Sequence, residues 1–107
     1  MLVTVSSRHM EVTEPLKAYA EQKANKLMKY YDRIQEIEVV FDANKDHTSV
    51  EFIVNAEHKN MFVAHQADAN AYAGVDACFD KLERQLSDHK KKVRNRKHAT
   101  DDKHTMK

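Results

Sequence analysis

The segment IQEIEVVFDANKDHTSVEFIVNA, residues 34–56, contains two runs in which apolar and polar side chains alternate. The apolar positions of these runs are Ile37, Val39, Phe41, Val50, Phe52 and Val54. A period of two residues predicts half-buried β-strands, because successive side chains of a strand point to opposite faces. Residues 44–47 between the runs have the composition of a hairpin loop. The segment therefore predicts a β-hairpin.

On the N-terminal side of this hairpin the spacing is helical, ending near Asp32. Thr13 is suited to the N-cap position, and Pro15 is tolerated in the first turn. The stripe that recurs at steps of three and four residues consists of Leu16, Tyr19, Ala20, Lys23, Ala24, Leu27, Tyr30 and Tyr31. Because Lys23 falls inside this stripe, we expect its aliphatic stem to pass the core and its ammonium group to reach the rim.

The remaining runs predict two more strands and a second helix. Residues 1–6 alternate, with Val3 and Val5 on the face expected to be buried. MFVAHQA, residues 61–67, predicts another strand, but its apolar residues do not define one inward face. Asn70 can cap a helix. The apolar stripe of that helix is Tyr72, Val75, Phe79, Leu82, Leu86, His89 and Val93.

The predicted order is β-α-β-β-β-α, an α+β fold. Two helices with one apolar stripe each must share a face of the sheet, which predicts a two-layer sandwich with a four-stranded mixed sheet. A right-handed crossover through the first helix makes the first two strands parallel. If the last helix spans residues 71–97 it measures roughly 40 Å, whereas an eight-residue strand spans about 26 Å. Its final turns must therefore extend past the sheet.

Length and composition indicate one domain. The chain has 107 residues with one Gly and one Pro, so we expect a single domain over residues 1–97 and a short disordered tail over residues 98–107. No stretch resembles a signal peptide or a membrane span, which favours a soluble cytoplasmic protein that does not contact a membrane. A lone cysteine, Cys78, cannot form an internal disulfide.

The charge of the chain is unevenly distributed. Residues 1–89 carry ten Lys and Arg against fifteen Asp and Glu, whereas residues 90–107 carry eight against two. The net charge of +1 therefore hides a positive C-terminal end. Such segregation favours a polyanionic partner.

Six basic residues occupy the eight positions 90–97, immediately after the predicted apolar stripe. On a helical wheel Lys81, Arg84 and Lys91 lie on the side that faces solvent. One interpretation is a solvated helix end whose cations oppose the helix dipole. One or two lysines would satisfy that role, so we favour a functional surface for a polyanionic partner.

YAGVDACFDKLERQLSDHKKK, residues 72–92, resembles the signature helix of the ribosome hibernation promoting factors, also called ribosome-associated inhibitors. VTEPLKAYAEQKANKLMKYYDRI, residues 12–34, resembles the first helix of that family without a gap. Tyr72 and Asp76 match its Tyr-Ala-x-x-Asp pattern. Gly74 stands where the family favours alanine, at a cost of up to about 1 kcal/mol in helix propensity. We expect no second domain after residue 107, and the chain in that respect resembles the short forms.

The resemblance implies a stress-response protein that stops translation and preserves the ribosome. Its implied partner is the small ribosomal subunit, bound through ribosomal RNA in the channel for messenger and transfer RNA. It implies no enzyme activity, small-molecule substrate or cofactor, and we expect a monomer away from the ribosome. Residues that the resemblance assigns to RNA are Lys23, Lys26, Arg33, Lys81, Arg84 and Lys90. Charge and wheel position add Lys29, Lys91, Lys92, Arg94, Arg96 and Lys97.

Two other functions remain open. Seven histidines could suggest a metal-binding protein. No H-E-x-x-H or C-x-x-C motif occurs, and the H-x₅-H pair His98 and His104 has no cysteine pair to complete a site, so we expect no metal site. Cys78 flanks the apolar stripe, where a thiol is usually inert. Alternatively, the same fold could bind a protein or a different RNA. The outward row Glu36, Glu38 and Glu51 is compatible with a protein contact or simply with a solvated sheet surface.

Overall fold

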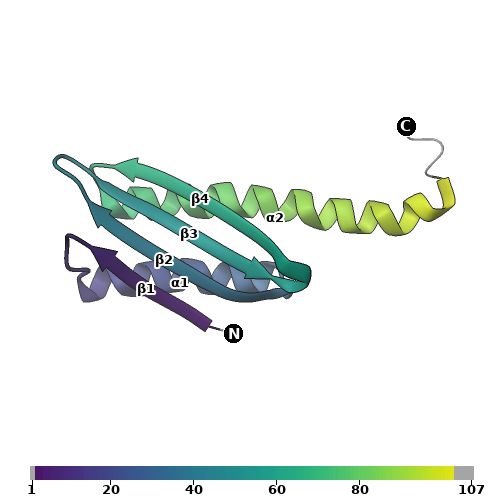
Figure 1. Cartoon of the computed structure of the whole chain (residues 1–107), viewed down its shortest axis with the longest axis horizontal. Coiled ribbons are helices and arrows are strands. Elements are labelled where there is room, and N and C mark those ends of the chain that lie inside the picture. The colour runs from purple at the N-terminus through teal and green to yellow at the C-terminus, as the bar shows by residue number, and fades with distance from the viewer. Residues whose placement is uncertain (1, 103–107) are drawn as a thin grey trace.

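The computed structural model describes the backbone of residues 2–102 and the side chains of residues 2–92. The elements in chain order are β1 (Leu2–Arg8), α1 (Glu14–Tyr30), β2 (Ile34–Ala43), β3 (Thr48–Ala56), the 3₁₀ turn η1 (Glu57–Lys59), β4 (Asn60–Asp68) and α2 (Ala71–Asp102) (Figure 1). The predicted order β-α-β-β-β-α is confirmed.

The four strands form one mixed sheet in the order β1-β2-β3-β4. β1 and β2 are parallel, with Val5 opposite Val39, as the crossover through α1 predicts. β2 pairs with β3 and β3 with β4 in antiparallel register, which places Val39 opposite Phe52 and Ile53 opposite Val63. The predicted hairpin is therefore the centre of the sheet.

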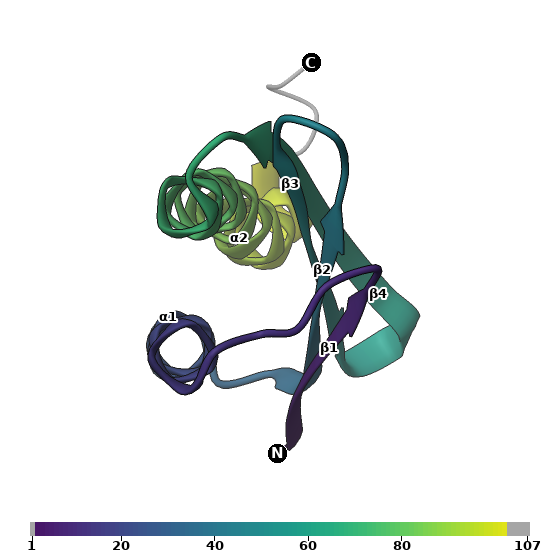
Figure 2. The same cartoon turned by 90° about the vertical axis from the view of Figure 1, so that its left-hand side faces the viewer.

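Both helices cover the same face of the sheet, which makes the molecule a two-layer α+β sandwich (Figure 2). α1 packs mainly against β1 and β2, and α2 packs mainly against β3 and β4. The fully buried residues between the layers come from both helices and the central strands. The largest of them are Phe41, Phe52, Leu27, Ile37, Leu82 and Leu86. Val3 and Val5 of β1 are half-buried against this core, on the predicted face.

The face that β4 buries is now defined. Ala64 is buried and Phe62 packs against the core, whereas Met61 and Val63 point to the opposite, open face. The sequence left this undetermined because both sets of alternate positions in β4 contain apolar residues.

Helix α1 begins as its cap residue predicts. The hydroxyl oxygen of Thr13 accepts a hydrogen bond from the backbone N–H of Leu16, and Pro15 occupies the first turn. The helix ends at Tyr30 and not at Asp32, because Tyr31 has extended backbone angles. The side chain of Lys23 passes the core as predicted and is 20% exposed.

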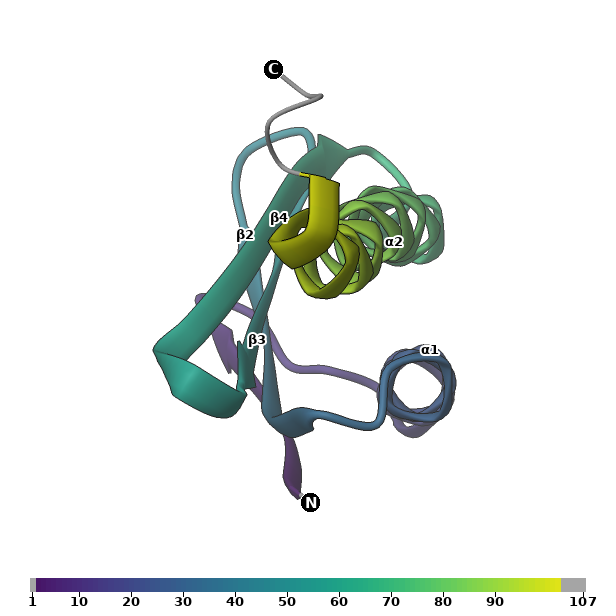
Figure 3. The ribbon, with the colours of Figure 1, turned by 90° about the vertical axis from the view of Figure 1, so that its right-hand side faces the viewer.

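Helix α2 begins after Asn70, whose side-chain oxygen accepts a hydrogen bond of 2.9 Å from the backbone N–H of Tyr72. It continues to Asp102, five residues past the predicted end, and its last turns extend beyond the sheet (Figures 1 and 3). The predicted tail therefore starts inside this helix, and residues 103–107 lie outside the described part of the chain.

Gly74 allows a close approach between α2 and the sheet. A Cβ atom added to Gly74 would lie 2.8 Å from Cγ2 of Val50, a fully buried residue of β3. This close packing gives a structural reason for a glycine inside a helix, where its propensity is unfavourable.

Candidate nucleic-acid interface

The predicted RNA-binding cations lie on or beside two helices that run side by side in the same direction (Figure 1). Lys23, Lys26 and Lys29 are on α1, and Arg33 follows it. The others belong to α2 and are Lys81, Arg84, Lys90, Lys91, Lys92, Arg94, Arg96 and Lys97. For the last three only the backbone is described, and their side chains lie outside the described residues.

Lys23 connects the two helices. Its Nζ lies 3.6 Å from Oδ1 of Asp76 and 4.9 Å from the ring centre of Phe79, both on α2. The same carboxylate accepts a hydrogen bond of 2.5 Å from the hydroxyl of Tyr19, and the rings of Tyr19 and Tyr72 meet edge to face. Lys23 is thus engaged in the packing between the helices, a role that its spacing in the sequence did not reveal.

The hydroxyl of Tyr19 is held in its neutral, protonated form. The hydrogen bond to Asp76 raises the pKa of Tyr19 above its ordinary value of 10.0, with smaller contributions from desolvation and from the negative charge of Asp76. This carboxylate therefore has two partners on α1, the Tyr19 hydroxyl and the Lys23 ammonium group.

Lys81 covers the outer edge of the sheet. Its Nζ donates hydrogen bonds to the backbone oxygen of His65 at 2.8 Å and to the side-chain oxygen of Gln66 at 2.9 Å. One turn later, Gln85 donates to the backbone oxygen of Val63 at 3.0 Å. Two side chains of α2 thus satisfy carbonyl groups of β4 that would otherwise be free to pair with another strand.

Lys90 and Arg33 also have protein partners. Nζ of Lys90 donates a hydrogen bond to the backbone oxygen of Tyr30 and lies 4.3 Å from the centre of its ring. Arg33 pairs with Glu57 at 3.0 Å, and this hydrogen bond raises the pKa of the Arg33 guanidinium. The positions that the family resemblance assigned to RNA therefore include four cations that already bind protein groups.

The remaining predicted cations with described side chains are exposed. They make no hydrogen bond or ion pair with any other residue whose side chain is described, and they are Lys26, Lys29, Arg84, Lys91 and Lys92. We call this set the free cations. They lie on the solvent side of both helices, where a phosphate can reach them without breaking an existing contact.

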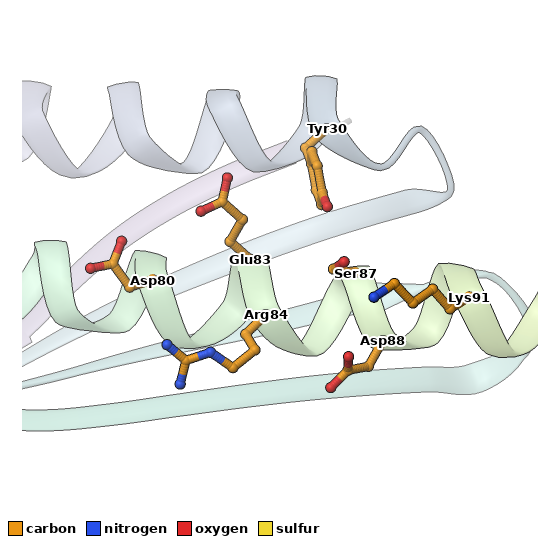
Figure 4. A pocket seen from close by; sticks show the side chains of 7 residues that line it. All are labelled: Tyr30, Asp80, Glu83, Arg84, Ser87, Asp88 and Lys91. Carbon is orange, nitrogen blue, oxygen red and sulfur yellow. The ribbon is translucent and has the colours of Figure 1, made fainter.

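A groove of about 470 Å³ lies between α1 and α2 beside the free cations (Figure 4). It is lined by Tyr30, Asp80, Glu83, Arg84, Ser87, Asp88 and Lys91. Tyr30 and Glu83 point toward the opposite helix, whereas Arg84 and Asp88 project away from α1 (Figure 4). Asp80 and Glu83 line the groove together with the ring of Tyr30, so a phosphate is disfavoured inside it.

Two tyrosines contribute exposed aromatic surface. Tyr30 and Tyr72 are 38% and 39% exposed although both belong to the predicted apolar stripes. Their positions in the stripes predicted burial, but both residues lie at the ends of packed regions, where their rings are partly exposed. Tyr30 offers an aromatic face at the mouth of the groove, but Lys90 is already positioned over its ring.

The histidines and the cysteine provide no reactive centre in the described part of the chain. Within it, no group of three or more His, Cys, Asp or Glu residues is arranged to hold a metal ion. His89 packs edge to face against Tyr31 and Phe62, as its stripe position predicts. Cys78 is buried, and burial raises the pKa of its thiol to about 11, which disfavours a thiolate nucleophile. No helix in the described ranges is apolar enough over sufficient length to span a membrane.

Comparison with known proteins gives consistent results. A family model described as Sigma 54 modulation protein / S30EA ribosomal protein matches residues 3–94. A ribosome hibernation promoting factor from Pseudomonas putida is 35% identical over 101 residues, covering 86% of this chain and 89% of that protein. The Escherichia coli K12 protein of the same name is 34% identical over 97 residues, covering 88% and 98%.

Solved structures share the fold. A ribosomal subunit interface protein from Coxiella burnetii superposes with a TM-score of 0.78 at 26% identity, covering 84% of this chain and 98% of that one. The N-terminal domain of Protein Y from Thermus thermophilus gives a TM-score of 0.71 at 26% identity, covering 80% and 96%.

Proposed function

This chain belongs to the Sigma 54 modulation protein / S30EA ribosomal protein family, and from that premise we propose that it is a ribosome hibernation factor. It associates with ribosomes in the cytoplasm, binds small-subunit ribosomal RNA in the channel for messenger and transfer RNA, and thereby stops translation while preserving the ribosome. The names of its relatives support ribosome association. The small subunit and its channel are what the family resemblance implies, and the charge of the helices supports contact with RNA.

The observation that carries the proposal is the set of free cations on the solvent side of the helix pair. Lys26 and Lys29 present cations from α1, and Arg84, Lys91 and Lys92 present them from α2. Cations that neutralise phosphates release condensed counterions, which supplies affinity without reading sequence. Structured RNA is recognised largely by shape, for which a rigid pair of helices is suited.

The engaged cations support the same function indirectly. Lys23 and Lys90 hold the two helices together, at the middle and at the C-terminal end of α1. Because the free cations lie on both helices, this fixed spacing sets the distance between the phosphates that they can contact. The last turns of α2 extend past the sheet, so RNA can approach that end from more than one side (Figure 1).

Co-sedimentation tests the proposal. The full chain is incubated with separated small subunits, large subunits and whole ribosomes, and each mixture is pelleted over a range of salt concentrations. We expect the protein to pellet with small subunits and whole ribosomes at low salt and to be released as salt rises. Free protein in the small-subunit sample at low salt, with its circular dichroism spectrum intact, would contradict the proposed site.

Inhibition is tested separately from binding. Addition of the protein to a cell-free translation reaction is expected to lower the yield of product, and adding messenger RNA after the protein is expected to restore little of it. If the protein pellets with small subunits but leaves translation unchanged, the binding site lies outside the proposed channel.

A further inference from the structure

No described segment of the chain covers the face of the sheet opposite the helices (Figures 2 and 3). Its side chains are the alternate residues of the four strands that do not point to the core. Strand register places them in rows across the sheet. One row is Leu2, Glu36, Asn55 and Met61, the next is Thr4, Glu38, Ile53 and Val63, and the third is Ser6, Val40, Glu51 and His65. We call these three rows the outer face.

One end of the outer face is apolar. Met61 and Val63 of β4 are 60% and 42% exposed, and Val63 lies opposite Ile53 of β3. Outward positions of a solvated strand are usually polar, yet β4 presents no Asp, Glu, Lys or Arg among its outward positions Met61, Val63, His65 and Ala67. Adjacent exposed apolar side chains of this kind are typical of interaction surfaces.

The acidic residues of the outer face lie on its two central strands. Glu36 and Glu38 follow one another along β2, and Glu51 lies on β3 beside them. None of the three forms an ion pair with another residue whose side chain the structure describes. These three rows contain no Lys or Arg, and Arg8, in the next row of the same face, lies opposite Asp42. The apolar cluster and the carboxylates meet directly, since Glu38 lies opposite Ile53.

We propose that the outer face is a docking surface for a cationic protein segment that carries apolar side chains. Charge complementarity selects this partner, because unpaired carboxylates attract lysine and arginine and repel the phosphates of RNA. The apolar cluster around Val63 then gives the partner's apolar side chains a place to be buried. The partner lies across the face and does not extend the sheet at β4, whose carbonyl groups Lys81 and Gln85 already occupy.

The dimensions of the surface indicate which class of complex it can form. Four strands about 4.8 Å apart, with outward side chains about 6.7 Å apart along each, give roughly 400 Å². A stable interface buries about 800 Å² on each partner, so this surface fits a weak, transient complex. Such an interaction is independent of RNA binding by the helices, and it can be tested without ribosomes.

The test uses the full chain labelled with ¹⁵N and titrated with an acetylated heptapeptide of alternating lysine and valine. We expect the amide signals of β2, β3 and β4 to shift, and those of the solvent side of α2 to remain in place. A heptapeptide of alternating glutamate and valine is the control for the sign of the charge and is expected to cause no shift. A short RNA hairpin is expected to shift signals of the helices only.

Three variants locate the contact. The variant with Glu36→Gln, Glu38→Gln and Glu51→Gln is expected to bind the lysine peptide at least tenfold more weakly. Its matched control removes the same charge from the groove between the helices through Asp80→Asn, Glu83→Gln and Asp88→Asn, and is expected to change the Kd less than twofold. The third variant, Met61→Thr with Val63→Thr, is expected to weaken binding at least threefold.

Several results would overturn the proposal. The first is that the lysine peptide leaves the amide signals of the outer face unchanged, and the second is that both charge variants weaken peptide binding equally. The third is an unchanged Kd for the peptide in the Met61 and Val63 variant. The fourth is that the RNA hairpin, and not the peptide, shifts the amide signals of the outer face. Gln and Thr side chains are compatible with a β-strand, so the variants are expected to fold. The NMR spectrum of each variant without peptide shows whether it does. Ribosome binding in the sedimentation assay is read separately, so failure of one proposal does not imply failure of the other.

Discussion

Lys90 of α2 joins the two helices through a hydrogen bond of 3.2 Å from its Nζ to the backbone carbonyl oxygen of Tyr30, the last residue of α1. The carbonyl groups at the end of a helix have no partner within it and carry the negative end of the helix dipole. A cation at this position therefore satisfies a terminal carbonyl and opposes the dipole. It also lies over the ring of Tyr30, which adds a cation–π contact.

Replacing Lys90 by Met is accordingly expected to lower the free energy of unfolding by about 1 kcal/mol, since the hydrogen bond and the charge are lost while the length of the side chain is kept. The matched control is Lys91→Met on the next residue, which faces solvent and is expected to change stability by less than about 0.5 kcal/mol. Urea unfolding followed by circular dichroism measures both. Equal losses would mean that the contact with Tyr30 contributes nothing specific.

The hydrogen bond from Tyr19 to Asp76 predicts a pH dependence at the alkaline end. Because the folded pKa of Tyr19 lies above its unfolded value of 10.0, its contribution to stability is present below about pH 10 and is lost as pH rises through the folded pKa. We expect the free energy of unfolding to fall less between pH 9 and pH 11.5 in Tyr19→Phe than in the unsubstituted protein. Cys78 titrates in the same window in both proteins, so its effect cancels. Parallel pH profiles for the two proteins would contradict this assignment.

Gly74→Ala is expected to destabilise the protein by about 1 kcal/mol, although alanine is the better helix former. The added methyl group would meet Cγ2 of Val50, whose β-branched side chain cannot easily rotate away. In a Val50→Ala background the same change is expected to be neutral or stabilising. Thermal unfolding of the four proteins in this double-mutant cycle measures the coupling. An equal effect of Gly74→Ala in both backgrounds would show that the close approach is not the cause.

Reversing two free cations through Arg84→Glu and Lys91→Glu is expected to weaken binding to the small subunit more than tenfold and to reduce its dependence on salt. The matched control is Lys17→Glu with Lys45→Glu. Lys17 lies in the first turn of α1 and Lys45 in the loop between β2 and β3, both at the end of the molecule remote from the last turns of α2 (Figure 1). Sedimentation over a salt series measures both. Equal weakening would indicate that net charge alone determines binding.

Periodicity was sufficient to predict the architecture of this chain. The alternation around Val39 and Phe52 and the helical spacing around Leu27 and Leu82 each have one period and one buried face. Residues 61–67 are different because Phe62 and Ala64 compete with Met61 and Val63 for the inward face. The choice depends on the register with β3, which is a non-local property. The end of α2 was placed too early because loss of the apolar stripe stops burial but does not stop a helix of Lys and Arg.

The partners of individual cations could not be predicted, because they lie far away in the sequence. Lys81 contacts the backbone of His65, and Lys90 contacts the backbone of Tyr30. Because every residue has a backbone carbonyl group, the residue type at these positions does not indicate the contact. Position within a charge cluster and position on a helical wheel identified Lys91 and Lys92 as exposed. These two criteria could not distinguish an unpaired lysine from Lys23, whose ammonium group pairs with the carboxylate of Asp76.

The contacts of Lys81 and Gln85 with β4 have a consequence for how the protein behaves when it is abundant. A sheet with two open edges can add neighbours at both and grow into a filament, whereas a sheet with one open edge can pair only once and then stops. With the β4 edge occupied by side chains of α2, β1 is the edge left for strand pairing. Edge-to-edge pairing through β1 gives a closed pair, and the contacts of Lys81 and Gln85 disfavour its extension into a fibre.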